Sequence, residues 1–261
     1  MQRRLRLAFI GWGAINTRVG ALLRERKTPA EIVGIATIDT PEARAGLPSG
    51  VRFLSAPSDL ADLKPDLVIE AAGRAAIAQW APTMIVASTS AFCDDDLLAW
   101  LIDLADSNGS QIQVPSGAIG GIDALAGAAV LGLDDVVHQI IKPPQAWRNT
   151  PAEQLVDLDN LAERKVFFSG TARQAAAAYP QNANATVVTS LAGVGLDKTR
   201  VDMIADPGSK LNSHRIVAGG AFGTMEITLE NKPLATNPKS SELTALSLVR
   251  LIEHRIGRLI V

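Results

Sequence analysis

The segment Arg6–Val19, RLAFIGWGAINTRV, constrains the fold more than any other part of the chain. An apolar run leads into Gly11 and Gly13, and Ile15 then begins a series of apolar residues at helical spacing. A strand, a glycine turn and a helix in this order are typical of a dinucleotide-binding fingerprint, whose glycines let a pyrophosphate approach the helix N-terminus. Asn16 stands where that fingerprint has its third glycine, so an ordinary glycine turn remains the alternative.

A second apolar run, residues 32–38, follows this helix and predicts the second strand of a βαβ unit. Asp39 comes directly after it, where an acid accepts hydrogen bonds from the adenosine ribose of NAD. Arg44 would instead favour the 2′-phosphate of NADP, and Asp39 lies farther from the glycines than the customary ~20 residues. The choice between NAD and NADP stays open, and a solvated loop acid is the alternative for Asp39.

Three further apolar segments, 66–73, 83–90 and 112–114, predict additional strands of a doubly wound parallel sheet. The first of them ends at Ala72 and Gly73, whose small side chains would leave room for the dinucleotide, although a plain turn explains them nearly as well. Three adjacent acids, Asp94 to Asp96, precede a helical stretch. Their position predicts capping of that helix rather than a metal site.

Length and charge limit the possible functions. A chain of 261 residues suits two small domains, and a net charge of −2 gives no basic footprint for nucleic acid or an anionic membrane. No apolar run reaches the ~18 residues of a membrane span, and one cysteine excludes an internal disulfide. The three scattered histidines offer no metal-ligand spacing. We therefore expect a cytoplasmic protein with a small-molecule partner and no metal.

The second half of the chain predicts an α+β domain. A glycine-rich turn over 115–121 marks the crossover, where the backbone of the turn would approach the nicotinamide or the turn would act as a simple hinge. Strand-like segments then recur and favour a largely antiparallel sheet. They are 136–142, 166–169, 199–205, 215–218 and 224–229. The expected domains are a Rossmann-type domain over 1–115, completed by a C-terminal helix within 240–261, and a substrate domain over 116–239.

Several polar residues of this half are candidates for a site. Thr171 is a plausible helix N-cap whose neighbouring amides would hold a substrate carboxylate, with ordinary capping as the alternative. Asn184 follows Asn182 by two residues, and both would face a site or form a turn. His214 belongs to an irregular polar loop over 205–214, between two predicted strands, and is the candidate base. His138 in a strand and His254 in the last helix are interpreted as structural.

The ordered set of motifs resembles the L-aspartate dehydrogenase family over nearly the whole chain. The segments that carry the resemblance are GWGAI at 11–15, SGAIGG at 116–121, KPP at 142–144, GTAR at 170–173, PQNAN at 180–184, ADP to NSH over 205–214, and NPKSS at 237–241. The resemblance implies a Rossmann domain, a second α+β domain that pairs subunits into a homodimer, and NAD(P)-dependent oxidation of L-aspartate to iminosuccinate, which hydrolyses to oxaloacetate or feeds NAD biosynthesis.

Residue by residue, the resemblance assigns the catalytic histidine to His214. The implied cofactor contacts are Gly11, Gly13, Ala14 and Ile15 of the first turn, with Ala118 and Asn184. Two substrate carboxylates need cations or helix amides, for which Lys142, Arg173, Lys210 and the Thr171 cap are candidates. Two other functions are compatible with the sequence: a different two-domain imine or semialdehyde reductase, and a regulatory protein that binds NAD(P) without turnover.

Overall fold

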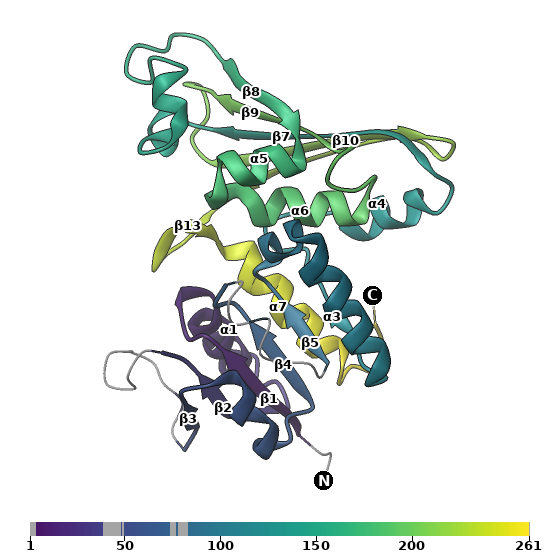
Figure 1. Ribbon diagram of the computed structural model, residues 1–261. Helices are drawn as coiled ribbons and strands as arrows, with labels where there is room; N and C mark the ends of the chain where they lie inside the picture. The colour runs from purple at the N-terminus through teal and green to yellow at the C-terminus, as the bar shows by residue number, and fades with distance from the viewer. Residues whose placement is uncertain (1–3, 39–47, 49, 74–76, 78–82, 261) are drawn as a thin grey trace. The chain divides into compact units, whose positions relative to one another are not determined.

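The computed structural model describes residues 4–38, 48, 50–73, 77 and 83–260. It divides into two compact units, residues 1–115 with 244–261, and residues 116–243 (Figure 1). None of the described helices has the length and hydropathy needed to cross a bilayer.

The first unit is built on a six-stranded sheet in the order β3-β2-β1-β4-β5-β6. Every pairing in it is parallel, which confirms the doubly wound class. The strands are β1 (Leu5–Ile10), β2 (Ala30–Ala36), β3 (Arg52–Leu54), β4 (Leu67–Glu70), β5 (Met84–Val86) and β6 (Ile112–Gln113). The helices are α1 (Ala14–Glu25), η2 (Pro57–Leu63), η3 (Thr89–Cys93), α3 (Asp95–Ser107) and α7 (Glu242–His254). The strand predicted over 83–90 is therefore shorter, and a 3₁₀ helix follows it.

The core of this unit joins residues from both ends of the chain. Leu7 and Phe9 of β1 belong to one buried cluster with Leu248 and Ile252 of α7. Each such side chain contributes about 1.5–3 kcal/mol when fully buried, so α7 is an integral part of the unit. Leu246 of the same helix lies outside this cluster and is 43% exposed.

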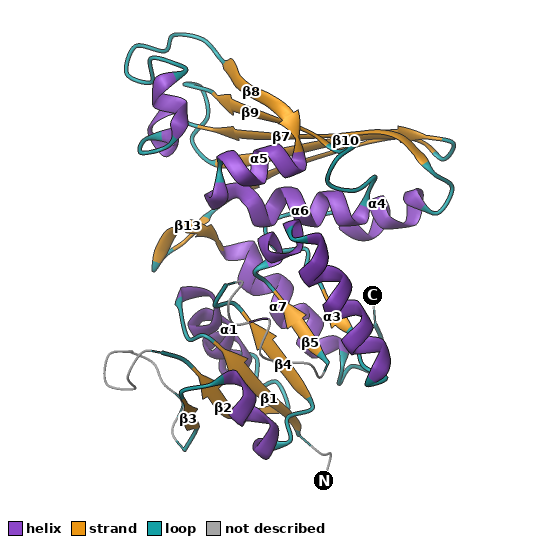
Figure 2. Ribbon diagram, viewed as in Figure 1, coloured by secondary structure: helices purple, strands orange, loops and turns teal. Residues whose placement is uncertain are grey.

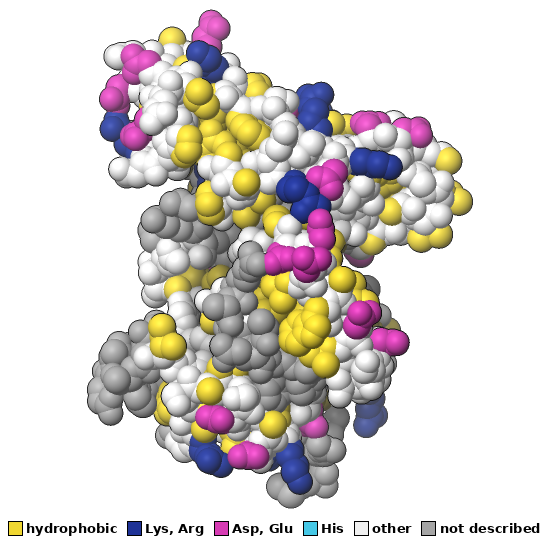
Figure 3. All heavy atoms as spheres, in the orientation of Figure 1, with side chains coloured by type: hydrophobic (Ala, Val, Ile, Leu, Met, Phe, Trp, Pro, Cys, Tyr) yellow, Lys and Arg dark blue, Asp and Glu magenta, His cyan; other side chains and the backbone are white. Residues whose placement is uncertain are grey.

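Helix α3 begins as its sequence predicts. Asp94 is the N-cap, and its Oδ1 accepts a hydrogen bond from the Leu97 amide at 3.1 Å, while two more acids occupy the first turn. Figure 3 shows acidic and hydrophobic side chains on this surface of the unit. Trp100 and Ile102 of α3 are exposed. The carboxylates of this run thus complement the helix dipole.

The second unit contains a five-stranded sheet in the order β11-β10-β7-β9-β8. Three of its pairings are antiparallel and that of β7 with β9 is parallel, so the sheet is largely antiparallel, as expected. The strands are β7 (Leu133–Lys142), β8 (Lys165–Thr171), β9 (Arg200–Ala205), β10 (Asn212–Gly220) and β11 (Gly223–Asn231), with a separate hairpin of β12 (Pro233–Leu234) and β13 (Asn237–Ser241). The helices are α4 (Ile122–Ala129), η4 (Pro144–Trp147), η5 (Pro151–Gln154), α5 (Ala172–Ala178), η6 (Pro180–Asn182) and α6 (Ala183–Ala192).

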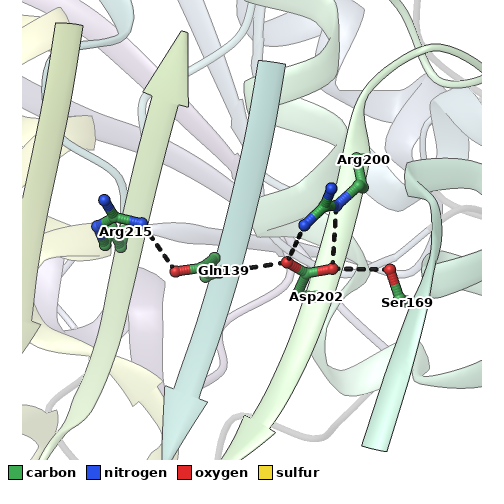
Figure 4. A network of polar contacts seen from close by, with 5 residues as sticks. All are labelled: Gln139, Ser169, Arg200, Asp202 and Arg215. Atoms are coloured by element: carbon green, nitrogen blue, oxygen red, sulfur yellow. Dashed lines mark hydrogen bonds and ion pairs between the residues drawn. The ribbon is translucent and has the colours of Figure 1, made fainter. Parts of the chain in front are cut away.

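The two faces of this sheet differ in what covers them. Helices α4, α5 and α6 lie along one face, which we call the inner face (Figure 2). Side chains alternate between the faces along each strand, so His138, His214 and Ile216 point to the inner face. The opposite, outer face carries a network of polar side chains that crosses the strands (Figure 4). Its members are Ser169, Arg200, Asp202, Gln139 and Arg215.

Candidate active site

The glycine turn after β1 has the features of an anion site. Gly11 has φ +82°, and a Cβ added there would lie 2.7 Å from the Cβ of Ala72, so the backbone requires glycine. Gly13 has an ordinary φ of −77° and no atom within 4 Å of an added Cβ, so nothing in the described chain requires glycine there. No side chain caps α1 and no acid lies in its first turn, where Ala14 and Ile15 present their amides. This arrangement fits a bound pyrophosphate.

Asn16 stabilises the same turn through hydrogen bonds to its backbone. Its side chain is fully buried, and Nδ2 donates to the carbonyl oxygens of Gly11 at 2.8 Å and Ile10 at 3.3 Å. Farther along α1, Gly20 leaves room for the Trp12 ring of the turn, because an added Cβ would lie 2.8 Å from that ring. The departure from the fingerprint is therefore accommodated within the fold.

A buried carboxyl group fixes the loop after β4. Glu70 is fully buried, and Oε1 accepts hydrogen bonds from the amides of Ala72 at 2.6 Å and Gly73 at 2.8 Å and from the Ser88 hydroxyl at 2.8 Å. Burial raises the pKa of Glu70, whereas these donors favour its ionised form. Because Ala72 also packs against Gly11, the loop and the glycine turn have one defined arrangement. Asp39 lies outside the described residues.

The second glycine-rich turn lies against β11. Gly121 has φ +69°, and a Cβ there would overlap the Ile227 side chain at 2.3 Å. The carbonyl oxygen of Ala118 accepts a hydrogen bond from Asn231 Nδ2 at 2.8 Å. Packing on the sheet thus explains Gly121, and the contact with Asn231 holds Ala118 at the end of β11.

His214 lies near this end of the sheet, within β10. The prediction that it belongs to an irregular loop is wrong, because β10 begins at Asn212 and His214 is paired with Leu229 on one side and Ile140 on the other. Sheet pairing on both sides fixes its backbone and leaves its side chain on the inner face. A base held in this way has a defined direction.

A second histidine contacts His214 directly. His138 Nε2 lies 3.0 Å from His214 Nδ1, and His138 Nδ1 lies 3.1 Å from the Thr189 hydroxyl on α6. His138 and Thr189 are completely buried and His214 is 6% exposed. The sequence interpretation of His138 as a purely structural strand residue did not include this contact. The alternation of side chains along 136–142 was the available signal, but it does not reveal the partner 76 residues away.

Lys142 is the nearest cation to this pair. It ends β7, its Nζ donates to Asn182 Oδ1 at 2.6 Å, and it lies 4.9 Å from the centre of the Trp147 ring. Burial lowers the pKa of Lys142 to about 8. The pKa of His214 is lowered well below its usual value by burial and by the nearby His138 and Lys142, and burial lowers the pKa of His138 to about 4. Both imidazoles are therefore neutral at pH 7.

Two other candidates lie elsewhere in this unit. The Thr171 hydroxyl accepts a hydrogen bond from the Gln174 amide in a capping box at the start of α5, and Thr171 pairs with Arg200. His138 pairs with Val201, one residue along β9 from Arg200. Thr171, however, alternates with Ser169 on the outer face, and among the described residues no hydrogen bond joins its side chain to the histidines. Asn184 is exposed in the first turn of α6. Within the described chain, no group of three or more His, Cys, Asp or Glu side chains is arranged to hold a metal.

Comparison with known proteins decides the family. Residues 123–255 match the family model "aspartate dehydrogenase, C-terminal", and residues 11–115 match that of the homoserine dehydrogenase NAD-binding domain. An L-aspartate dehydrogenase of Brucella anthropi is 49% identical over 98% of both chains. The chain belongs to the aspartate dehydrogenase family. Another member, the L-aspartate dehydrogenase of Pseudomonas aeruginosa, is 42% identical over 95% of this chain and 96% of its own.

Solved structures agree with membership of the aspartate dehydrogenase family. The crystal structure of aspartate dehydrogenase from Thermotoga maritima superposes with a TM-score of 0.77, at 25% identity and 99% coverage of both chains. A homoserine dehydrogenase from Thiobacillus denitrificans has a TM-score of 0.60 at 14% identity, covering 98% of this chain and 75% of its own, and shares the fold alone. The fold of this family member is thus common to enzymes with different substrates.

Proposed function

We propose that this member of the aspartate dehydrogenase family oxidises L-aspartate to iminosuccinate with NAD or NADP as hydride acceptor. The observation that carries the proposal is a buried, neutral His214 near a half-buried Lys142 at one end of the inner face. The first is a base and the second is a cation, which are the two groups that an amino dicarboxylate requires.

The glycine turn supports a nicotinamide dinucleotide. Gly11, Gly13 and the amides of Ala14 and Ile15 would hold the pyrophosphate, for the reasons of space and free amides given above. Further contacts are proposed for Ala72, Gly73, Ala118 and Asn184, and Asp39 would decide between NAD and NADP. When bound, the nicotinamide supplies the hydride acceptor for the substrate α-carbon.

His214 would act on the substrate amine. Hydride leaves the α-carbon readily when the amine is neutral, because the nitrogen lone pair then forms the C=N bond. No described residue is hydrogen-bonded to His214 Nε2, so this nitrogen is open to accept a proton from the substrate ammonium. The same nitrogen would accept a proton from the water that hydrolyses iminosuccinate to oxaloacetate and ammonia, unless the imine leaves intact and feeds NAD biosynthesis.

Lys142 would bind one substrate carboxylate. Its ammonium group contacts a neutral amide and an aromatic ring, and no ion pair is formed by it within the described residues. A half-buried cation without a carboxylate partner is partly desolvated, and a dianionic substrate would supply that partner. This arrangement favours a dicarboxylic amino acid over one with an apolar side chain.

A substrate panel tests the function. The purified protein is mixed with NAD or NADP and with L-aspartate, D-aspartate, L-glutamate, L-asparagine or L-homoserine, and formation of reduced nicotinamide is followed by absorbance. We expect turnover with L-aspartate and at least about tenfold less with L-asparagine, which lacks the second charge. Turnover with another substrate alone would support a different reductase, and binding of NAD(P) without any turnover would support a regulatory protein.

We also propose that the protein is a homodimer formed through the outer face of the five-stranded sheet. No helix of this unit described here covers that face, which carries half-buried Val137 and Val217 beside its polar network. Light scattering on the purified protein would give twice the 27.5 kDa mass of the chain. A monomer at micromolar concentration would contradict the proposal. We place the enzyme in the cytoplasm, where its dinucleotide partner is available.

A further inference from the structure

We infer that His138 and Thr189 are positioning residues that hold His214 in the tautomer with its proton on Nδ1, so that the Nε2 lone pair faces the substrate. The inference rests on the proposed function and concerns the same site. Neither residue touches the substrate in this account. They act through hydrogen bonds on the base.

The direction of these hydrogen bonds follows from Thr189. Its hydroxyl carries one proton and lies 3.2 Å from the carbonyl oxygen of Ala185, one turn earlier in α6. A carbonyl only accepts, so Thr189 donates there and its oxygen accepts from His138 Nδ1 at 3.1 Å. His138 then has its proton on Nδ1 and its lone pair on Nε2. That lone pair accepts from His214 Nδ1 at 3.0 Å.

The opposite arrangement makes one fewer hydrogen bond. If His214 carried its proton on Nε2, its Nδ1 would accept from His138 Nε2, and His138 Nδ1 would need a proton from Thr189. The buried Thr189 hydroxyl would then lose its contact with the part-buried Ala185 carbonyl. Because an unmade buried hydrogen bond is costly, the first arrangement is favoured.

This relay orients the base without an anion. Among the described residues, the charged or titratable groups that act on His214 are His138 and Lys142, from β7, and no carboxylate contacts the pair. When His214 Nε2 takes a proton, both ring nitrogens become donors, and Nδ1 still donates to His138. Proton uptake therefore needs no rearrangement of the buried side chains. A His–carboxylate pair would instead raise the proton affinity of the base.

Substitutions separate positioning from simple packing. His138→Phe removes the acceptor but keeps an aromatic ring, and we expect kcat to fall about 10- to 100-fold with little change in KM. His138→Gln places an amide oxygen near the position of Nε2, so we expect it to restore most of kcat. Thr189→Val should lower kcat by a smaller factor, whereas Thr189→Ser should retain it.

Thr186→Val is the matched control. Thr186 is also completely buried on α6, and its hydroxyl donates to the Ala183 carbonyl at 2.9 Å, but it makes no hydrogen bond with a described histidine. Loss of a buried hydroxyl on this helix is therefore common to both valine variants. Unchanged kcat in Thr186→Val with a fall in Thr189→Val would support the relay. Equal falls in both would show that helix packing is responsible and would overturn it.

A spectroscopic measurement makes the test independent of turnover. Nitrogen-15 NMR of the labelled protein at pH 7.5, without substrate, distinguishes protonated from unprotonated ring nitrogens. We expect His214 to have protonated Nδ1 and unprotonated Nε2, and Thr189→Val to reduce that preference even if His138→Phe does not fold. A natural chain with His214 protonated on Nε2 would overturn the inference. Absence of aspartate turnover would instead contradict the proposed function and leave this NMR result unaffected.

Discussion

The two faces of the five-stranded sheet differ in whether their buried polar side chains have partners of opposite charge. On the outer face, Asp202 is 3% exposed, yet it accepts hydrogen bonds from Arg200, Ser169 and Gln139 (Figure 4). Burial alone would raise its pKa, but these donors outweigh burial and lower it. On the inner face, burial lowers the pKa values of His138, His214 and Lys142, and no carboxylate of the described residues compensates for it.

The difference separates structural from chemical roles. A buried charge with partners on several sides is satisfied within the fold and gains little from a ligand. A buried base or cation without an opposite charge is costly to the fold, and such perturbed groups are typical of functional sites. The comparison therefore predicts that changes on the inner face alter kinetics and that changes on the outer face alter stability.

The largest expected effect is that of His214→Asn. The asparagine side chain can still donate to His138 Nε2 but has no base in the place of His214 Nε2, so we expect kcat with L-aspartate to fall about 10²- to 10⁴-fold. Cofactor affinity, measured by quenching of tryptophan fluorescence, should change little. A variant with natural kcat would remove His214 from the mechanism.

Substitution of Lys142 is expected to have the next largest effect. Lys142→Met keeps the length of the side chain and removes its charge, so we expect kcat/KM for L-aspartate to fall about 10- to 100-fold, chiefly through KM. Because the pKa of Lys142 is about 8, KM of the natural chain should also rise above that pH as the ammonium group loses its proton. A KM that is constant from pH 7 to 9.5 would argue against this carboxylate contact.

The histidine pair also predicts a loss of stability in acid. An unfolded chain binds a proton on His138 below pH 6.5, whereas the folded chain does so only near pH 4. The free energy of unfolding should therefore fall as the pH drops from 6.5 to 4, by ~1.4 kcal/mol per pH unit for this proton. Urea unfolding measured at several pH values should show that the free energy of unfolding of His138→Gln falls less steeply with pH, by this amount per pH unit. An equal slope in both proteins would mean that His138 is accessible to protons in the fold.

The smallest kinetic effect is expected on the outer face. Asp202→Asn weakens the contacts with Arg200 and Ser169, and we expect a loss of about 1 kcal/mol of stability, a few degrees in Tm, with kcat unchanged. Calorimetry and steady-state assays on the same sample would measure both. A tenfold fall in kcat would contradict the division of roles between the faces.

Much of the first unit could be predicted from the sequence because its signals are local. Gly11 has a positive φ that favours glycine, and the space beside Gly13 is open. The apolar patterns of β1 and α1 lie on either side of this turn in the sequence. The role of Asn16, at the third position of the fingerprint, could not be predicted. Its side chain donates hydrogen bonds to the carbonyl oxygens of Ile10 and Gly11, a contact that the sequence does not reveal.

The inner face of the second unit was harder to predict because its contacts are distant in sequence. Polar residues before His214 indicate a loop, but pairing of β10 with β7 and β11 extends the strand to Asn212. The contact between His138 and His214 depends on the register between β7 and β10, which cannot be read from the sequence pattern of either strand alone. Lys142 was a candidate because the substrate carboxylates need cations, whereas Asn182 and Trp147 as its partners required the three-dimensional structure.

The most direct test of the account is the rate at which L-aspartate reduces nicotinamide on the protein. The natural chain, His214→Asn and Asp202→Asn are each pre-equilibrated with saturating NAD or NADP, mixed rapidly with L-aspartate, and followed by absorbance of the reduced ring. We predict rapid reduction in the natural chain and in Asp202→Asn, and a rate at least about 100-fold lower in His214→Asn. Equal rates in the natural chain and His214→Asn, or no reduction in the natural chain, would contradict the account.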